Sequence, residues 1–175
     1  MPIETILANE TLAHRRLAQE EGKKIFRAIL VSDRKMKHPF WDIDEVVNLD
    51  EGSVQRYTKE IPFINGHRQS EAGQVCGTVE NLSIVGLNKA PGKGLRKLMG
   101  DIILDESELG VMLAGRYSDK NASRALSIGF SFNHEEIMLY EKKGQTPILT
   151  YLKSTLQEVS AVAVPRNVDA KVIPS

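Results

Sequence analysis

The sequence has a single cysteine, Cys76, among its 175 residues. One thiol cannot form an internal disulfide, and without a pair or quartet of cysteines we expect no structural zinc site. Such sparing use of cysteine is typical of proteins that fold in a reducing compartment. The sequence also has no run of about 18 uncharged apolar residues, the length that a membrane-spanning helix requires. We therefore expect a soluble protein made without a secretion signal.

An excess of charge of either sign is absent as well. Lys and Arg number 23 and Asp and Glu number 23, so the formal net charge is zero. A neutral chain argues against a protein that coats nucleic acid or binds an anionic membrane. The partner is therefore expected to be a protein or a small molecule. The length fits one domain with one hydrophobic core.

The composition changes along the chain in a way that divides it into three parts. Residues 1–23 carry charges every few positions among helix-forming residues, which predicts an N-terminal helix or flexible arm. The main domain is predicted over 24–170, and 171–175 form a C-terminal tail without a clear element of its own. This ending suggests an engineered or self-cleaved terminus, and we hypothesise a natural processing site near Ser175.

The main domain consists of short apolar runs separated by glycine, proline, asparagine and charged residues. These runs predict about seven strands, at 24–32, 61–66, 74–86, 97–105, 125–133, 136–142 and 156–165. Two further segments, 51–60 and 106–119, have helical patterns. Because regular helices do not separate the strands, the fold class is predicted to be mainly β (α+β), an antiparallel barrel with peripheral helices.

The run 125–133 places small and large side chains at alternate positions. Residues of a strand alternate between its two faces, so the large apolar residues share one face and Ser127 lies on the other. Only the apolar face suits a core. Ser127 is followed at the next position on its own face by Gly129, which leaves room for another backbone to approach. Ser127 is therefore a candidate nucleophile, although a small face covered by neighbouring strands explains the same pattern.

A serine nucleophile needs a base, and histidine serves best near neutral pH. The sequence offers His14, His38, His67 and His134. Three of them lie in polar, charged segments typical of a solvated surface. His67 instead follows an apolar run at the end of a predicted strand, where a rigid element can orient its ring. We therefore favour His67 as the base, against the simpler alternative of a loop histidine.

A third group usually orients the imidazole and stabilises its charged form. Glu158 is the notable candidate, because it interrupts a β-rich run in which a charge is costly unless it is paired or faces water. A strand-edge glutamate in contact with solvent explains the pattern equally well. Asp101 and Asp105, on either side of an apolar run, are weaker candidates.

The order of these segments and their residue patterns resemble those of the prohead proteases of tailed bacteriophages (caudoviruses). This family is similar in fold to the herpesvirus assembly proteases. The resemblance covers roughly 24–170, and its most specific parts are the last two of four segments. These segments are FINGH (63–67), GQVCGTVENLSI (73–84), ALSIGF (125–130) and EVSAVAVPRNVDA (158–170).

The resemblance implies a serine endopeptidase with Ser127 as nucleophile, His67 as base and Glu158 as third member. Such proteins more often have an aspartate where Arg68 follows the histidine here. Because the herpesvirus enzymes use a second histidine as third member, His134 or His38 remains an alternative to Glu158.

The resemblance also implies where the enzyme acts and on what. The expected substrates are the scaffold protein, or a scaffold-like arm of the major capsid protein, and the protease itself. Cleavage would take place in the host cytoplasm inside the assembling prohead, without metal or organic cofactor and without direct contact to nucleic acid or membrane. The resemblance is compatible with a homodimer.

Three rival interpretations remain. Cys76 could be the nucleophile if its pKa were lowered. The segment GLNKAPGKG resembles a phosphate-binding loop, but five residues instead of four separate Gly86 from Gly92, and Gly94 replaces the Ser or Thr that binds magnesium. A noncatalytic β-barrel that binds scaffold during head assembly is the rival from another functional class.

Overall fold

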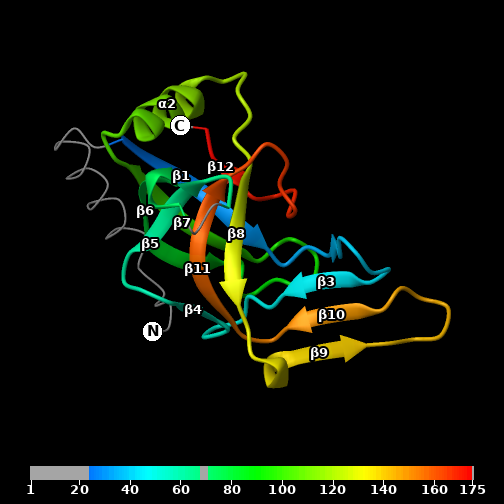
Figure 1. Ribbon diagram of the computed structural model, residues 1–175. Helices are drawn as coiled ribbons and strands as arrows, with labels where there is room; N and C mark the ends of the chain where they lie inside the picture. The colour runs from blue at the N-terminus through cyan, green and yellow to red at the C-terminus, as the bar shows by residue number, and fades with distance from the viewer. Residues whose placement is uncertain (1–23, 68–70, 175) are drawn as a thin grey trace.

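The computed structural model describes residues 24–67 and 71–174 (Figure 1). The helix or arm expected for 1–23, together with His14 and Arg68, lies outside these residues. The described chain is mainly β, which confirms that part of the fold prediction. Its α-helix, α2 (Glu108–Ser118), lies within the segment 106–119 predicted to be helical. No helix in the described part of the chain is long and apolar enough to span a membrane.

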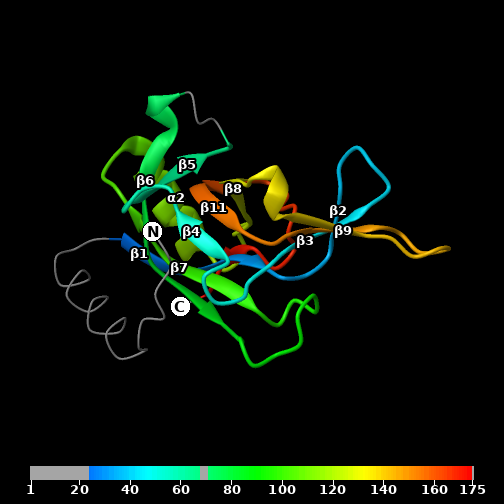
Figure 2. The same cartoon turned by 90° about the horizontal axis from the view of Figure 1, so that it is seen from below.

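The strands form a large and a small sheet. The large sheet has eight strands in the order β12-β1-β7-β6-β5-β11-β4, and β8 pairs with β11 outside this path. The small sheet has the order β2-β3-β10-β9 and projects from the rest of the molecule in Figure 2. The bounds in the large sheet are β1 (Lys24–Ser32), β4 (Val54–Arg56), β5 (Ile61–Asn65), β6 (Val75–Val85), β7 (Lys97–Leu104), β8 (Leu126–Ser131), β11 (Ser154–Ala161) and β12 (Lys171–Val172). Those in the small sheet are β2 (Met36–Lys37), β3 (Asp44–Val47), β9 (Ile137–Tyr140) and β10 (Ile148–Tyr151), and two 3₁₀ turns are η1 (Ala72–Gln74) and η2 (His134–Glu136).

Neither sheet closes on itself within the described residues, so the expected barrel is not confirmed. The pairing is also not wholly antiparallel, because β11 runs parallel to both β4 and β5, and β10 runs parallel to β3. The segment after residue 170, expected to be a tail, contributes β12 to the edge of the large sheet beside β1.

The helix expected over 51–60 is wrong. This segment contains β4, preceded by a turn in which Gly52 has a φ of 74°. Positive φ is readily adopted by glycine and interrupts a right-handed helix. Val54 is 3% exposed, because β4 inserts it into the core beside β11.

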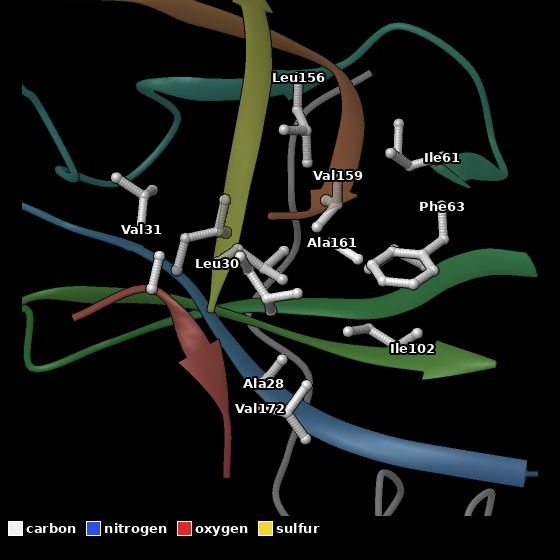
Figure 3. Close-up of a cluster of buried hydrophobic side chains, with 14 of the residues drawn as sticks. Ala28, Leu30, Val31, Ile61, Phe63, Ile102, Leu156, Val159, Ala161 and Val172 are labelled. Atoms are coloured by element: carbon white, nitrogen blue, oxygen red, sulfur yellow. The ribbon is translucent and has the colours of Figure 1, made fainter. Parts of the chain in front are cut away.

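The hydrophobic core collects side chains from both edges and the middle of the large sheet (Figure 3). The residues labelled there are Ala28, Leu30 and Val31 of β1, Ile61 and Phe63 of β5, Ile102 of β7, Leu156, Val159 and Ala161 of β11, and Val172 of β12. Burying each large aliphatic or aromatic side chain contributes about 1.5–3 kcal/mol. This cluster therefore fixes the relative positions of β5 and β11, which carry the candidate site.

A β-bulge in β11 decides which of its side chains enter that core. Leu156 is opposite Phe130 of β8, yet Glu158 is opposite the adjacent residue, Gly129, so Gln157 is the extra residue of the bulge. A bulge of this kind re-aims the side chains that follow it. Leu156 and Val159 consequently both face the core, and Glu158 does not enter the apolar cluster.

Candidate active site

His67 lies immediately after β5, in a turn joined to the end of β11. The Gly66 amide donates a hydrogen bond to the Ala161 carbonyl, with the N and O atoms 3.0 Å apart. Gly66 and His67 both have positive φ, 75° and 58°. This conformation is common for glycine but strained for histidine, and strained residues concentrate at functional sites. The turn thus directs a half-exposed imidazole back toward β11.

The imidazole of His67 contacts the carboxylate of Glu158. The Nδ1 and Oε1 atoms are 2.6 Å apart, and the Glu158 side chain is only 2% exposed. A buried carboxylate is costly unless a cation or hydrogen-bond donors stabilise it. The structure therefore brings together two of the three residues expected to form the site.

This contact affects the pKa of His67 and determines which ring nitrogen carries the proton of the neutral form. The hydrogen bond that His67 donates to Glu158 raises the pKa of His67 above its ordinary value, partial burial opposes this effect, and the negative charge of Glu158 adds to it. Because Nδ1 faces the carboxylate, the neutral ring keeps its proton on Nδ1. Its Nε2 then has a free lone pair, which is the requirement for a general base.

Ser127 lies on β8, the strand paired antiparallel with β11. It is directly opposite Ser160, and Gly129 is opposite Glu158. Directly opposed residues place their side chains on the same face of a sheet. The Ser160 Oγ atom is 3.1 Å from Nδ1 of His67, so Ser127 lies on the face that carries the histidine and glutamate.

The Ser127 hydroxyl makes no hydrogen bond with His67 or with any other side chain in the described part of the chain. The residue is partly buried and also borders a cavity of about 50 Å³ together with Leu30 and Arg166. The structure thus places Ser127 on the expected face, one strand away from a joined histidine–glutamate pair. In ligand-free enzymes the contact between nucleophile and base is often long and tightens on substrate binding.

Ser160 is a member of this cluster that the sequence analysis missed. Its hydroxyl donates a hydrogen bond to Oε2 of Glu158, and the residue is fully buried. Its Oγ atom also lies 3.1 Å from Nδ1 of His67. The two residues occupy alternate positions of one strand, so the period-two rule places their side chains on one face. This two-residue spacing is the signal in the sequence that links Ser160 to Glu158.

The alternative third members have other partners. Asp101 is fully buried and pairs with Arg27, whose Nη1 atom is 3.1 Å away. His38 faces Glu45, with 3.7 Å between Nε2 and Oε1. Asp105 instead accepts hydrogen bonds from the backbone and hydroxyl of Ser107, the N-cap of α2.

The remaining alternative, His134, begins the exposed turn η2, where its ring packs edge-on against Phe132. Among the candidates within the described residues, Glu158 is the one whose carboxylate meets His67.

The rival sites have little structural support. Cys76 is fully buried in β6, and burial raises the pKa of its thiol to about 12. A thiol that stays protonated is a poor nucleophile. The segment 86–94 joins two antiparallel strands, β6 and β7, whereas a phosphate-binding loop leads from a strand into a helix.

A cavity of about 340 Å³ opens beside His67. Its walls come from the turn after β5, from α2 and from the segment that follows β11. The lining is mainly apolar, with Leu113 and Ala163 among its members, and Arg116 supplies a positive charge. A cavity of this size and composition is suited to a side chain or short peptide segment.

No group of three His, Cys, Asp or Glu side chains within residues 24–67 and 71–174 is arranged to hold a metal ion. Comparisons of the chain with protein-family models, with curated protein sequences and with solved structures found no match.

Proposed function

We propose that the protein is a serine endopeptidase in which Ser127 is the nucleophile, His67 the general base and Glu158 the group that orients the base. One observation carries the proposal. A buried glutamate fixes Nδ1 of His67, with 2.6 Å between the two atoms, on the sheet face where β8 presents Ser127. A base held by a carboxylate beside a serine is the arrangement required for acyl transfer.

The chemistry follows from the proton positions. Nε2 of His67 accepts the Ser127 hydroxyl proton as Oγ forms a bond to the scissile carbonyl carbon. The protonated ring then donates that proton to the departing amine as the C–N bond breaks, which leaves an acyl-enzyme. Water, deprotonated by the same nitrogen, releases the acyl group and restores the serine. Glu158 stabilises the imidazolium during both transfers.

Ser160 acts as a positioning residue in this scheme. Its hydroxyl holds Oε2 of Glu158, and this leaves Oε1 directed at His67. A hydrogen bond to a charged group contributes about 1.5–3 kcal/mol. Full burial prevents Ser160 from reaching a substrate, so its effect on the reaction passes through the carboxylate.

The substrates that we propose follow from the resemblance to phage prohead proteases. They are the scaffold protein or a scaffold-like arm of the major capsid protein, and the protease itself, cleaved inside the assembling prohead. The apolar cavity beside His67 supports a peptide substrate, because it offers space next to the base for one of its side chains. A fold of the herpesvirus-protease kind belongs to the same proposal.

The experiment is cleavage of scaffold and capsid proteins co-expressed with the protease. We expect cleavage by the wild type and none by the Ser127→Ala variant. The control is Ser131→Ala, because Ser131 is an exposed serine on the same strand. Equal cleavage by the wild type and Ser127→Ala would overturn the assignment of the nucleophile.

A noncatalytic scaffold-binding module is the second candidate. The observation in its favour is the Ser127 hydroxyl, which forms no hydrogen bond to His67 within the described chain. Under this alternative, the wild-type protein binds scaffold without cleaving it, and Ser127→Ala binds equally well. Cleavage that depends on Ser127 would exclude it.

A further inference from the structure

Arg116, in the last turn of α2, has no carboxylate partner within the described residues. Its Nε atom donates a hydrogen bond to the Ser123 carbonyl, with 3.2 Å between the two atoms, and its two Nη groups have no partner in that part of the chain. Ion pairs with aspartate or glutamate hold four other arginines, which are Arg27, Arg34, Arg96 and Arg166. The guanidinium of Arg116 is thus held at one nitrogen, and two nitrogens are available to an anion.

The place of Arg116 in the helix has a simpler explanation, which accounts for only part of its charge. The carboxyl end of a helix carries about half a negative charge, so a basic residue in the last turn is favourable there. Asp119 follows α2, but its carboxylate accepts from the Asn121 amide and forms no ion pair with Arg116. The helix therefore leaves a positive charge that a ligand can balance.

Arg116 and Ser123 both line the cavity of about 340 Å³ beside His67. The other walls are mainly apolar, and Leu113 and Ala163 are among them. None of the described residues that line the cavity is an aspartate or glutamate. An arginine on an apolar wall without an acidic neighbour suits a ligand that has an apolar stem and an anionic end. The side chains of aspartate and glutamate are of this kind.

The cavity borders both residues that carry out the proposed reaction. His67 is one of its lining residues, and so is Ala125, which lies two positions before Ser127. Ala125 forms a β-bridge with Lys171, so the chain is extended there and Ala125 points to the same side as Ser127. Two extended residues span only about 7 Å. A side chain next to the scissile bond therefore reaches the cavity while the scissile carbonyl lies at Ser127.

We propose that this cavity is a specificity site for an acidic side chain of the substrate, and that Arg116 binds its carboxylate. The proposal rests on the serine endopeptidase function proposed above and adds a residue preference, namely aspartate or glutamate at one of the two positions that flank the scissile bond. The Nη groups of Arg116 donate to the carboxylate, while Leu113 and Ala163 contact the apolar stem. Arg116 contacts a side chain of the substrate and takes no part in proton transfer.

A matched pair of peptides tests the recognition of charge. Mass spectrometry of a bacterial proteome-derived peptide library after cleavage gives the preferred sequence, and we expect aspartate or glutamate to be enriched at one flanking position. The peptide of that sequence is then compared with one in which the acid is replaced by its amide, which has nearly the same size. We expect kcat/KM to be about tenfold higher for the acidic peptide, because the arginine–carboxylate pair is charge-assisted but partly exposed to water.

Variants of two arginines assign this preference to the cavity. In Arg116→Gln the ratio of the two kcat/KM values should fall to within about twofold of one, whereas Arg116→Lys keeps the charge and should keep part of the preference. The matched control is Arg124→Gln. Arg124 also donates to a backbone carbonyl at the end of α2, that of Asp119, but does not line the cavity. Each ratio compares two substrates on one preparation, so a change in the fraction of folded enzyme cancels.

Three results of this experiment overturn the proposal. The first is a wild type that cleaves the acidic peptide and its amide equally well. The second is a preference that Arg116→Gln leaves unchanged. The third is an Arg116→Gln variant that cleaves both peptides more slowly by the same factor, because that result places the guanidinium at the reacting carbonyl and not at the flanking side chain.

A binding measurement separates this proposal from the assignment of the protease. The same peptide library is passed over immobilised Ser127→Ala protein and, in parallel, over Ser127→Ala/Arg116→Gln. Acidic peptides enriched on the first protein and not on the second support the acidic site even if the wild type cleaves no peptide. Equal retention of acidic peptides by the two proteins contradicts it even if cleavage depends on Ser127.

Discussion

The molecule contains two buried glutamates that face a histidine, and they differ in what remains available for chemistry. Glu158 and Glu45 are 2% and 1% exposed, beside His67 and His38 respectively. His38 uses Nδ1 to accept the Phe40 amide, and its Nε2 faces the buried carboxylate of Glu45 at 3.7 Å. His67 places Nδ1 against Glu158, which leaves Nε2 free.

The two carboxylates also differ in the groups, other than histidine, that they contact. Glu45 is held by the guanidinium of Arg166 and by the hydroxyl of Tyr151, whose oxygen is 2.5 Å from Oε1. Glu158 accepts a hydrogen bond from the hydroxyl of Ser160. The guanidinium of Arg166 balances the charge of Glu45, and Glu158 lies where it can stabilise a positive charge that develops on His67. The comparison shows that a buried glutamate–histidine pair becomes a candidate site only where one ring nitrogen stays free.

The largest expected effect is a loss of cleavage rate that distinguishes His67 from His38. We expect His67→Ala to lower the rate of substrate cleavage by about 10⁴-fold or more, because triad members act as a unit. His38→Ala should retain activity within about tenfold, since Nδ1 of His38 accepts backbone amides and its Nε2 faces Glu45 and not a serine. Single-turnover cleavage assays on both variants measure the difference. Similar losses of cleavage rate in the two variants would contradict the different roles given to His67 and His38.

Glu158 should be needed for catalysis, whereas Glu45 should be needed for stability. Glu158→Gln is expected to lower kcat by about 10²- to 10³-fold, less than the loss of the base, because Nε2 is still present but its ring is poorly oriented. Glu45→Gln should instead lower the free energy of unfolding by about 3 kcal/mol, since Arg166 loses its charged partner. Urea denaturation and cleavage kinetics on the same preparations measure both. A Glu45→Gln protein that is folded yet inactive would contradict this division.

Removing the hydroxyl of Ser160 should have a smaller effect on the reaction. We expect Ser160→Ala to lower kcat about 10- to 100-fold with KM nearly unchanged, because the charged hydrogen bond to Glu158 is lost. Ser160→Thr keeps the hydroxyl and should recover most of the activity. The matched control is Ser154→Ala, because Ser154 is also buried in β11 but its hydroxyl has no hydrogen-bond partner among the described residues. Equal losses in Ser160→Ala and Ser154→Ala would indicate a general packing effect.

The smallest expected effect is a shift in pH dependence. His67 must be neutral to act as a base, and Glu158 raises its pKa above 6.5. The acid limb of kcat/KM for the wild type should therefore lie above about pH 6.5. In Glu158→Gln this limb should move to lower pH. A limb at the same pH in both proteins would contradict the assignment of His67 and Glu158 as a pair.

The same pKa shift has a consequence for stability. Because the pKa of His67 is higher in the folded than in the unfolded protein, the resulting stabilisation is fully present below the unfolded pKa. It is lost as the pH rises through the folded pKa. The wild type and Glu158→Gln should therefore become more similar in free energy of unfolding as the pH rises from the unfolded to the folded pKa of His67. Urea denaturation at several pH values measures this change.

Much of β8 could be predicted from the sequence because its alternation is local. Leu126 is buried, and Ile128 and Phe130 pack against the core as the apolar positions require. The end of β5 and the position of His67 after it followed from an apolar run and a glycine. These features depend on neighbouring residues, which is the range over which sequence patterns are informative.

The arrangement of the site depended on contacts that no local pattern encodes. The opposition of Ser127 and Ser160 follows from the register between two strands far apart in the sequence, and that register changes at the bulge formed by Gln157. Strands of two to four residues, such as β2, β4 and β12, are too short to show a period of two. The parallel pairing of β11 with β5 requires core packing between distant segments, so the expected antiparallel arrangement was wrong there.

The activation of Ser127 by His67 is the central claim, and labelling with a fluorophosphonate probe tests it most directly. The probe reacts with serines whose hydroxyl is deprotonated by a neighbouring base. At high protein concentration and at several pH values, we expect one labelled peptide containing Ser127, and no labelling in the His67→Ala variant. Labelling at another serine, or labelling of Ser127 that persists in His67→Ala, would contradict it.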